Sequence, residues 1–254
     1  MNKIKDIKKG FYLHFIEHMK AESFMDFFFE LFISGSAYIV GGYFRDYLLN
    51  KDSRDIDIIT DISNDLLLSL IKNSNATYSI NRYGGMKISL QSTEIDIWTI
   101  DNNWAFKNNL VTLNDNDKLN SIAKGCFYNF DSLVINLHTF NYNLRYFNEC
   151  MSNKELNILQ ENSVYKNLNP SIEANILRAI YLAKKYDLDF SLNTINYLFS
   201  KIGYIDDKYE DPLERLLTIR DQYPKYTSIN ENDILNLLFK LREKQNSNQL
   251  RIDF

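Results

Sequence analysis

Residues 37–60 read AYIVGGYFRDYLLNKDSRDIDIIT, and this stretch decides the fold. An apolar run ends at Gly41 and Gly42, a short helical pattern follows, and aspartates then alternate with isoleucines. Alternate side chains of a β-strand point to the same side, so Asp55 and Asp57 share one face while the isoleucines point into the core. Carboxylates at this spacing repel each other unless solvent or a cation compensates them. The stretch therefore predicts two strands, a glycine turn with a helix between them, and a cluster of negative charge.

The bulk composition is that of a globular chain. Its 254 residues, 45% of them apolar, are enough for one large domain or two small ones. The net charge of −4 gives no general basic field for nucleic acid, so any such contact needs a local patch. The two cysteines form no CxxC pair, which argues against a disulfide scaffold and fits a reducing cytosol. No apolar run of about 18 residues occurs, and we expect a cytoplasmic protein with no signal peptide and no membrane span.

Hydrophobic periodicity divides the chain into two parts. Helical spacing over 3–33 precedes a region with five strand-like segments, which are AYIV, DIDIIT, TYSINRY, MKISLQ and EIDIWTI. Farther along, strand signals are absent and four segments follow the helical period, namely SIEANILRAIYLAKKY, SLNTINYLFSKI, DPLERLLTIRDQY and INENDILNLLFKLREK. We therefore predict an α/β head built on a small mixed sheet, residues 1–140, followed by an all-helical neck or body, residues 141–254.

A third carboxylate, Asp96, alternates with isoleucines in EIDIWTI. If this strand lies beside DIDIIT, then Asp55, Asp57 and Asp96 converge on one small area. Mg²⁺ prefers such oxygen ligands, and two ions can bridge a nucleoside triphosphate and activate an attacking hydroxyl. An Asp-x-Asp pattern alone is weak evidence, because it is more often a solvated polar edge. Here a Gly-Gly turn suited to phosphate comes just before it, and the two features together favour a metal-dependent site for phosphate chemistry.

VGGYFRDYLLNKDSRDIDIIT resembles the head-domain signature of class II tRNA nucleotidyltransferases (CCA-adding enzymes) and bacterial poly(A) polymerases. These belong to the DNA polymerase β-like nucleotidyltransferase superfamily. The Gly-Gly, Arg-Asp, Leu-Leu and Asp-x-Asp elements follow the order and approximate spacing of that family. YGGMKISLQSTEIDIWTI resembles the next family segment, whose strand carries the third carboxylate. The resemblance assigns this carboxylate to Asp96, with Glu94 on the same face as the alternative.

The resemblance implies an Mg²⁺-dependent nucleotidyltransferase that binds two metal ions and uses an NTP as substrate. Asp55, Asp57 and Asp96 would be both the catalytic carboxylates and the metal ligands. Gly41 and Gly42 would seat the triphosphate.

Arg45, on the helix after the glycine turn, has two interpretations. It contacts the triphosphate, or it is an exposed helix arginine that pairs with Asp46 or Asp55. We include it among the predicted nucleotide-binding residues, together with Arg178.

Two further segments resemble the family only in part. In KGCFYNFDSLVINL, the letters KGCF stand where the family has Arg-Arg-Asp-Phe. SIEANILRAIYLAKKYDLDF resembles the start of the family's neck helix, and its Leu-Arg-Ala, which contains Arg178, matches well. The Asp and Arg that read the incoming base are missing from this segment, which starts SIEAN where the family has Glu-Asp-x-x-Arg.

These departures favour nucleotidyl transfer in general over CCA addition in particular. We expect the 3′ end of a tRNA or of another RNA as the acceptor. Transfer to a protein or a small molecule, as in defence or toxin-type transferases, stays open, and the acidic net charge and short body lean toward it. A catalytically inactive nucleotide-binding module is the alternative from another class, and the intact carboxylate trio argues against it. The residues specify neither the preferred NTP nor the oligomeric state.

One further pattern has the order of a zinc site. Residues 14–18 spell H-x-x-E-H, as in inverted zinc proteases. No third-ligand motif follows, and the remaining histidine is His138. We interpret the pattern as a chance occurrence on an amphipathic helix.

Overall fold

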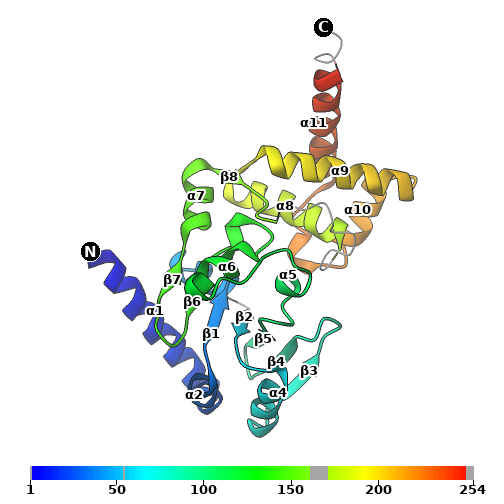
Figure 1. The fold of residues 1–254 in the computed structure, drawn as a ribbon. Coiled ribbons are helices and arrows are strands. Elements are labelled where there is room, and N and C mark those ends of the chain that lie inside the picture. The colour runs from blue at the N-terminus through cyan, green and yellow to red at the C-terminus, as the bar shows by residue number, and fades with distance from the viewer. Residues whose placement is uncertain (1, 54, 161–170, 250–254) are drawn as a thin grey trace. The chain divides into compact units, whose positions relative to one another are not determined.

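The computed structural model describes residues 2–53, 55–160 and 171–249. The chain forms two compact units, Met1–Asn148 and Glu149–Phe254 (Figure 1). The division falls inside helix α7 (Arg145–Asn153), whereas the sequence placed it at residue 140. Among the described residues, no helix combines the length and apolar character needed to cross a bilayer.

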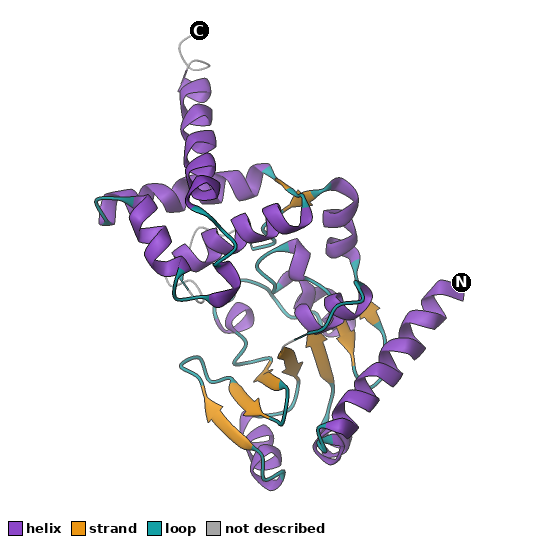
Figure 2. Cartoon of the chain, turned by 180° about the vertical axis from the view of Figure 1, so that it is seen from behind, coloured by secondary structure: helices purple, strands orange, loops and turns teal. Residues whose placement is uncertain are grey.

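The first unit is built on a mixed sheet whose described strands follow the order β3-β4-β5-β2-β1-β6-β7 (Figure 2). The strands are β1 (Ala37–Val40), β2 (Asp55–Thr60), β3 (Thr77–Ile80), β4 (Met86–Ser89), β5 (Glu94–Thr99), β6 (Val134–Asn136) and β7 (Tyr142–Asn143). β2 and β5 pair in parallel, and every other described pair in this sheet is antiparallel. Parallel strands need a long crossover, and here α4 and the β3–β4 hairpin supply it. The five predicted strands are therefore all present.

Helices surround this sheet. They are α1 (Asn2–Ala21), α2 (Met25–Ser34), α3 (Gly42–Leu48), α4 (Asn64–Asn73), α5 (Trp104–Lys107) and α6 (Lys118–Lys124), with 3₁₀ turns η1 (Asp115–Asp117) and η2 (Asn129–Asp131). Gly35 caps the end of α2, and its N–H donates to the carbonyl oxygen of Leu31. The Ser63 side chain caps α4 by accepting a hydrogen bond from the N–H of Leu66.

The face of β2 that carries Asp55 and Asp57 becomes apolar toward the C-terminal end of the strand. Ile59 lies on the same side of the strand as Asp55 and Asp57, and it packs with Tyr38 and with α6 in one buried cluster. The opposite face carries Ile56 and other fully buried side chains. The two aspartates themselves are only partly buried. One end of this face is therefore closed by α6, and the other end remains accessible.

The second unit contains the four predicted helices. They are α8 (Ile172–Tyr186), α9 (Leu192–Lys208), α10 (Pro212–Arg220) and α11 (Glu231–Gln249), with the 3₁₀ turn η3 (Pro224–Tyr226) between the last two. This unit also has a short parallel pair, β8 (Glu155–Leu156) with β9 (Asp189–Phe190), which the sequence analysis did not predict. Strands of two residues are too short to show an alternating pattern.

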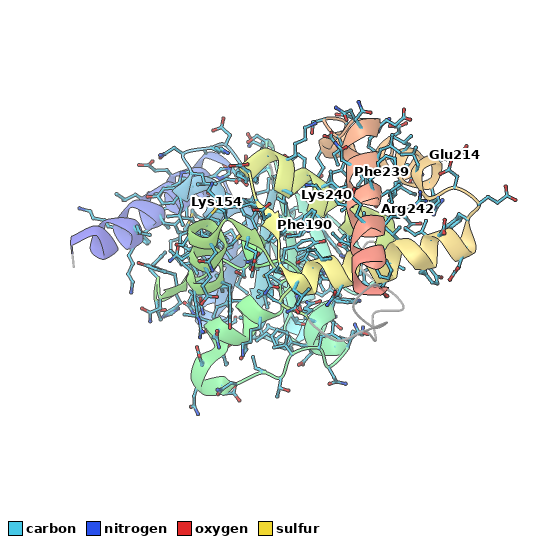
Figure 3. All side chains as sticks on the ribbon, turned by 90° about the horizontal axis from the view of Figure 1, so that it is seen from above. Lys154, Phe190, Glu214, Phe239, Lys240 and Arg242 are labelled. Atoms are coloured by element: carbon cyan, nitrogen blue, oxygen red, sulfur yellow. The ribbon has the colours of Figure 1, made fainter. Side chains whose placement is uncertain are left out.

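A cavity of about 540 Å³ lies in this second unit between β9, α9 and α11. Phe190 and Lys240 are among its lining residues (Figure 3). Its lining contains none of the residues that the sequence singled out for chemistry.

Buried polar contacts fasten the end of α1 to the turn before β5. Glu22, one residue after α1, is 6% exposed. Its carboxylate accepts hydrogen bonds from the N–H groups of Gln91 (2.8 Å) and Ser92 (3.2 Å). The hydroxyl groups of Ser92 and Thr93 donate to the same carboxylate. Burial alone would raise the pKa of Glu22, but these hydrogen bonds outweigh it and hold the pKa below its ordinary value.

Glu22→Gln is expected to lower the free energy of unfolding by about 2 kcal/mol at neutral pH, because buried donors lose a charged acceptor. A carboxyl whose pKa is depressed by folding stabilises the protein above its unfolded pKa, about 4.3. That contribution is lost as the pH falls through the lower folded pKa. Urea denaturation from neutral to acid pH should therefore show a steeper acid loss for the wild type than for Glu22→Gln. The exposed Glu17→Gln is the control, and equal slopes for wild type and Glu22→Gln would contradict this role.

Candidate active site

The candidate carboxylates lie on the paired strands β2 and β5. In their parallel register Asp57 is opposite Asp96, and Asp55 is opposite Glu94. Residues opposite each other in register point to the same face of a sheet, so these four side chains share one face. The predicted site requires DIDIIT and EIDIWTI to be neighbouring strands, and β2 and β5 are hydrogen-bonded to each other. Both candidates for the third carboxylate, Asp96 and Glu94, therefore lie beside the Asp-x-Asp.

β4 brings a cation, Lys87, onto the same face. Lys87 is opposite Asp96 in the antiparallel register of β4 and β5. Its Nζ lies 2.8 Å from Glu94 Oε2 and 3.8 Å from Asp96 Oδ2. The hydrogen bond to Glu94, followed by the charges of Asp96 and Asp55, raises the pKa of Lys87 against the opposing effect of burial. Lys87 thus compensates part of the negative charge that the aspartates create.

Sequence reasoning missed Lys87. The signal was its position in MKIS, where it alternates with two buried apolar residues. That pattern shows that Lys87 faces away from the core, but the antiparallel pairing of β4 with β5 is needed to put it beside Asp96.

The donor atoms on this face suit Mg²⁺ in kind, because carboxylate oxygens are its preferred protein ligands. Within the described residues, no group of three or more His, Cys, Asp or Glu side chains is arranged to hold a metal ion. Lys87 contacts both Glu94 and Asp96, and the predicted ligands are Asp55, Asp57 and Asp96. Metal binding by these residues stays a prediction.

The glycine turn lies beside the same end of β2. Val40 is opposite Asp57, so the chain that leaves β1 at Gly41 runs along the Asp55 end of β2. Gly41 has a φ of +73°, a region that favours glycine, and a Cβ there would lie 3.3 Å from the carbonyl oxygen of Asp131. The turn at this position therefore requires glycine.

The N–H of Gly41 is already used within the fold. It donates to the carbonyl oxygen of Leu133 at 2.8 Å. The carbonyl oxygen of Gly41 accepts the N–H of Arg45, which starts the hydrogen-bonding pattern of α3. Because the first N–H groups of a helix have no acceptor within it, those from Gly42 onward are the donors that this turn offers to a phosphate.

Arg45 is held by two carboxylates. Its Nη1 lies 2.7 Å from Asp131 Oδ1, and its Nε and Nη2 lie 3.0 and 2.9 Å from Asp46 Oδ1. Its guanidinium also lies over the ring of Phe130, 5.2 Å from the centroid. The predicted pairing with Asp46 is present, and Asp131 is a further partner of the guanidinium. The side chain is 15% exposed, so Arg45 is not the exposed arginine of that interpretation.

Asp131 is a second residue that sequence reasoning missed. It lies in η2, just before β6, inside the segment that resembles the family only in part. It binds Arg45, and its carbonyl oxygen lies next to Gly41. Asp131 therefore supports the glycine turn and the helix that follows it.

Arg178 lies on α8 in the second unit and is partly buried. Its predicted nucleotide contact stays a prediction, and the site described above consists of first-unit residues. Asn175, at a position where the family resemblance expects the base-reading Arg, is 2% exposed. Glu173 forms an ion pair with Arg215 at 2.8 Å.

The H-x-x-E-H pattern on α1 takes part in packing. The ring of His14 stacks on Tyr43, with centroids 5.3 Å apart. His18 uses both ring nitrogens for side-chain hydrogen bonds, to Tyr43 and to Thr93. These contacts support the interpretation that the pattern does not mark a zinc site.

Comparisons with known proteins point to the same part of the chain. Residues 37–120 match the family model of the Poly A polymerase head domain. This range contains the glycine turn and all four carboxylates of β2 and β5. No curated protein sequence matches the chain.

Several solved structures share the fold. A CCA-adding enzyme in complex with CTP has a TM-score of 0.59 at 16% identity, covering 83% of this chain and 48% of that one. A Thermotoga maritima CCA-adding enzyme complexed with tRNA has a TM-score of 0.57 at 18% identity, covering 83% and 47%. A tRNA nucleotidyltransferase complexed with a primer tRNA and an incoming ATP analogue has a TM-score of 0.55 at 17% identity, covering 82% and 57%. The chain thus spans about half the length of these proteins.

In its sheet, its paired carboxylate strands and its glycine turn, the first unit is similar to the head of a nucleotidyltransferase. More particularly, residues 37–120 match the poly(A) polymerase head domain, and the chain has the fold of the CCA-adding enzymes. The resemblance inferred from the sequence is therefore confirmed, as is the α/β head followed by a helical body.

Lys87→Met is expected to increase the stabilisation of the protein by Mg²⁺. Without the ammonium, Glu94 and Asp96 repel each other more strongly in metal-free buffer, at a cost of up to about 1 kcal/mol for partly exposed pairs. A divalent cation would offset that cost. Melting temperatures in chelator and in saturating Mg²⁺ measure the effect, with the exposed Lys107→Met as the matched control. If Mg²⁺ shifts Lys87→Met no more than the wild type, Lys87 does not compensate these carboxylates.

Proposed function

We propose that this protein is an Mg²⁺-dependent nucleotidyltransferase that moves an NMP from an NTP to an acceptor hydroxyl and releases pyrophosphate. The observation that carries the proposal is the in-register pairing of Asp57 with Asp96 beside the glycine turn. This pairing lies inside the segment that matches the poly(A) polymerase head domain. Neighbours of the same fold are complexed with CTP and with an ATP analogue, which supports an NTP as substrate.

Each group of residues has a distinct role in this proposal. Asp55, Asp57 and Asp96 would hold Mg²⁺, two ions being expected. The bound metal would neutralise phosphate charge and lower the pKa of the attacking hydroxyl. The N–H groups from Gly42 onward bind the triphosphate, and Gly41 supplies the conformation that aims them. The acceptor oxygen then forms a bond to the α-phosphorus, and the bond from that phosphorus to the leaving pyrophosphate oxygen breaks.

The two arginines are proposed as nucleotide contacts. For Arg45, a phosphate would compete with Asp46 and Asp131, which already occupy its guanidinium. For Arg178, the support is its place in the Leu-Arg-Ala of α8, which resembles the family's neck helix.

An RNA 3′ end, with tRNA as the main candidate, is the proposed acceptor. Two of the fold's neighbours are complexed with tRNA, which supports this choice. Transfer to a protein or a small molecule is the second candidate, because the neck segment lacks the base-reading pair and Asn175 is buried. A cytoplasmic location is part of the same proposal.

Asp57→Asn is expected to reduce pyrophosphate release by at least about 10²–10³-fold, because the variant removes a charge that the reaction uses. Release should be measured with Mg²⁺ and each of the four NTPs, with and without total tRNA. The exposed Asp101→Asn is the charge-matched control and should behave as the wild type.

The pattern of release separates the candidates. Release that needs tRNA and is lost in Asp57→Asn supports an RNA-tailing enzyme and identifies its nucleotide. Release without RNA, also lost in the variant, points to a protein or small-molecule acceptor. Activity that persists in Asp57→Asn would overturn the assignment of the carboxylates. NTP binding without release under any condition would favour the inactive binding module.

Asp96→Asn and Glu94→Gln are expected to differ in their effects. Asp96 is opposite Asp57, whereas Glu94 is bound by Lys87 and its side chain is 47% exposed. Asp96→Asn should therefore lose activity about as severely as Asp57→Asn, about 10²-fold or more, while Glu94→Gln keeps most of it. Steady-state kinetics of the two isosteric variants decide between them, and the reverse ranking would make Glu94 the third carboxylate.

A further inference from the structure

The N-terminal helix α1 lies outside the segment that matches the head-domain family, yet it contacts two parts of the candidate site. The family match begins at residue 37, and α1 ends at Ala21. His18 lies in the last turn of this helix, and Glu22 directly follows its last residue. Both side chains reach the turn before β5, and His18 also reaches α3.

His18 joins the element that follows the glycine turn to the strand of the third carboxylate. Its Nδ1 lies 2.8 Å from the hydroxyl of Tyr43, which comes directly after Gly42. Its Nε2 lies 2.7 Å from the hydroxyl of Thr93, which comes directly before Glu94. Tyr43 is 2% exposed and Thr93 is 5% exposed. One imidazole from outside the family segment therefore bridges residues adjacent to both halves of the site.

The donors and acceptors of this bridge fit a single arrangement. The hydroxyl of Thr93 donates to Glu22, because an ionised carboxylate can only accept. Thr93 must then accept from His18, so the ring carries its proton on Nε2. Burial lowers the pKa of His18 and outweighs the opposing charge of Glu22, so the ring is neutral at pH 7. Its Nδ1 therefore accepts the hydroxyl proton of Tyr43, and the chain of hydrogen bonds runs from Tyr43 through His18 and Thr93 to Glu22.

Ring packing holds the bridge in place. The rings of His18 and Tyr43 are stacked, with centroids 5.6 Å apart. Phe11, another residue of α1, is fully buried, and its ring contacts the Tyr43 ring edge to face with centroids 5.8 Å apart. Tyr43 is thus confined by α1 on its ring as well as on its hydroxyl.

We propose that His18 is a positioning residue for nucleotidyl transfer, which holds the glycine turn and the start of β5 at a set spacing. Glu94 and Asp96 follow Thr93 on β5, and the N–H groups of α3 begin one residue before Tyr43. A shift of α3 relative to the start of β5 would change the distance between the N–H groups proposed to bind phosphate and Asp96. His18 does not touch the substrate in this proposal, which rests on the proposed function and adds a residue to its machinery.

The test compares His18→Phe with His18→Gln and with His14→Phe. Phenylalanine keeps the ring packing but loses both hydrogen bonds, whereas glutamine keeps a donor and an acceptor. His18→Phe is expected to lower kcat for pyrophosphate release about 10-fold or more, because small misplacements of reacting groups are costly, with a smaller change in KM. His18→Gln should recover part of the loss. His14→Phe, which keeps a ring against Tyr43, should match the wild type.

A double-mutant cycle separates coupling from simple loss of stability. Tyr43→Phe and Thr93→Val each remove one end of the bridge. If His18 couples α3 to the start of β5, the Tyr43→Phe/Thr93→Val double variant is expected to lose about as much kcat as either single variant. Losses that multiply in the double variant, or a His18→Phe enzyme with unchanged kcat, would overturn the proposal.

A readout without turnover keeps the two proposals apart. Hydrogen–deuterium exchange should be compared for residues 41–48 and 90–96 in wild type, His18→Phe and His14→Phe. Faster exchange in both segments of His18→Phe alone supports the bridge, even if the wild type releases no pyrophosphate and the proposed function fails. Unchanged exchange in both segments refutes the bridge, whatever the activity.

Discussion

The parallel register of β2 with β5 is the constraint on which the candidate site depends. It puts Asp57 opposite Asp96 and Asp55 opposite Glu94, so four carboxylates share one face of the sheet. A slip of one residue would turn one strand's carboxylates into the core, where isoleucines now lie fully buried. Burying those isoleucines therefore holds the charges in place, because the same alternation that packs the core presents the aspartates to the accessible face. The energy of the apolar core and the geometry of the site are two consequences of one register.

Clustered charge needs compensation, and the chain provides part of it. Lys87 contacts Glu94 and Asp96 from β4, while Arg45 binds Asp46 and Asp131 next to the glycine turn. The first contact limits the repulsion among the carboxylates, and the second fixes the helix that starts at Gly42. Glu22 and His18 extend the same support from α1, which is not part of the family segment. The head is therefore stabilised around its charges by residues from several separate elements, with the glycine turn and the two strands at the centre.

The second unit contains the segment that resembles the family's neck helix but lacks the base-reading pair expected from that resemblance. Ser171 caps α8 through a hydrogen bond to the N–H of Ala174, and Asn175 is buried in the same helix. The segment still forms a helix, α8, and it contains the Leu-Arg-Ala. Its difference from the expected pattern is therefore in side chains and not in secondary structure. A shared fold does not fix the function, so the fold by itself leaves the nucleotide and the acceptor open. The chain spans about half the length of the solved proteins of this fold, which is a second reason to keep the acceptor a separate question.

Local patterns were sufficient to predict the strands β1 to β5, the helices α8 to α11, the glycine turn and the Asp-x-Asp, but not the short strands β6 to β9. Period-2 alternation in DIDIIT and EIDIWTI, and the cap of α4 at Ser63, depend only on near neighbours along the chain. Lys87, Asp131 and the bridge made by His18 could not be predicted in this way, because each contact joins residues that are far apart in sequence. The alternating pattern of a strand indicates only that its lysine faces solvent. The register with the neighbouring strand is needed to predict which carboxylate the lysine contacts. Sequence therefore determined which residues are candidates for the chemistry. Folding determined which distant residues contact them, because strand register and helix packing bring those groups together in space.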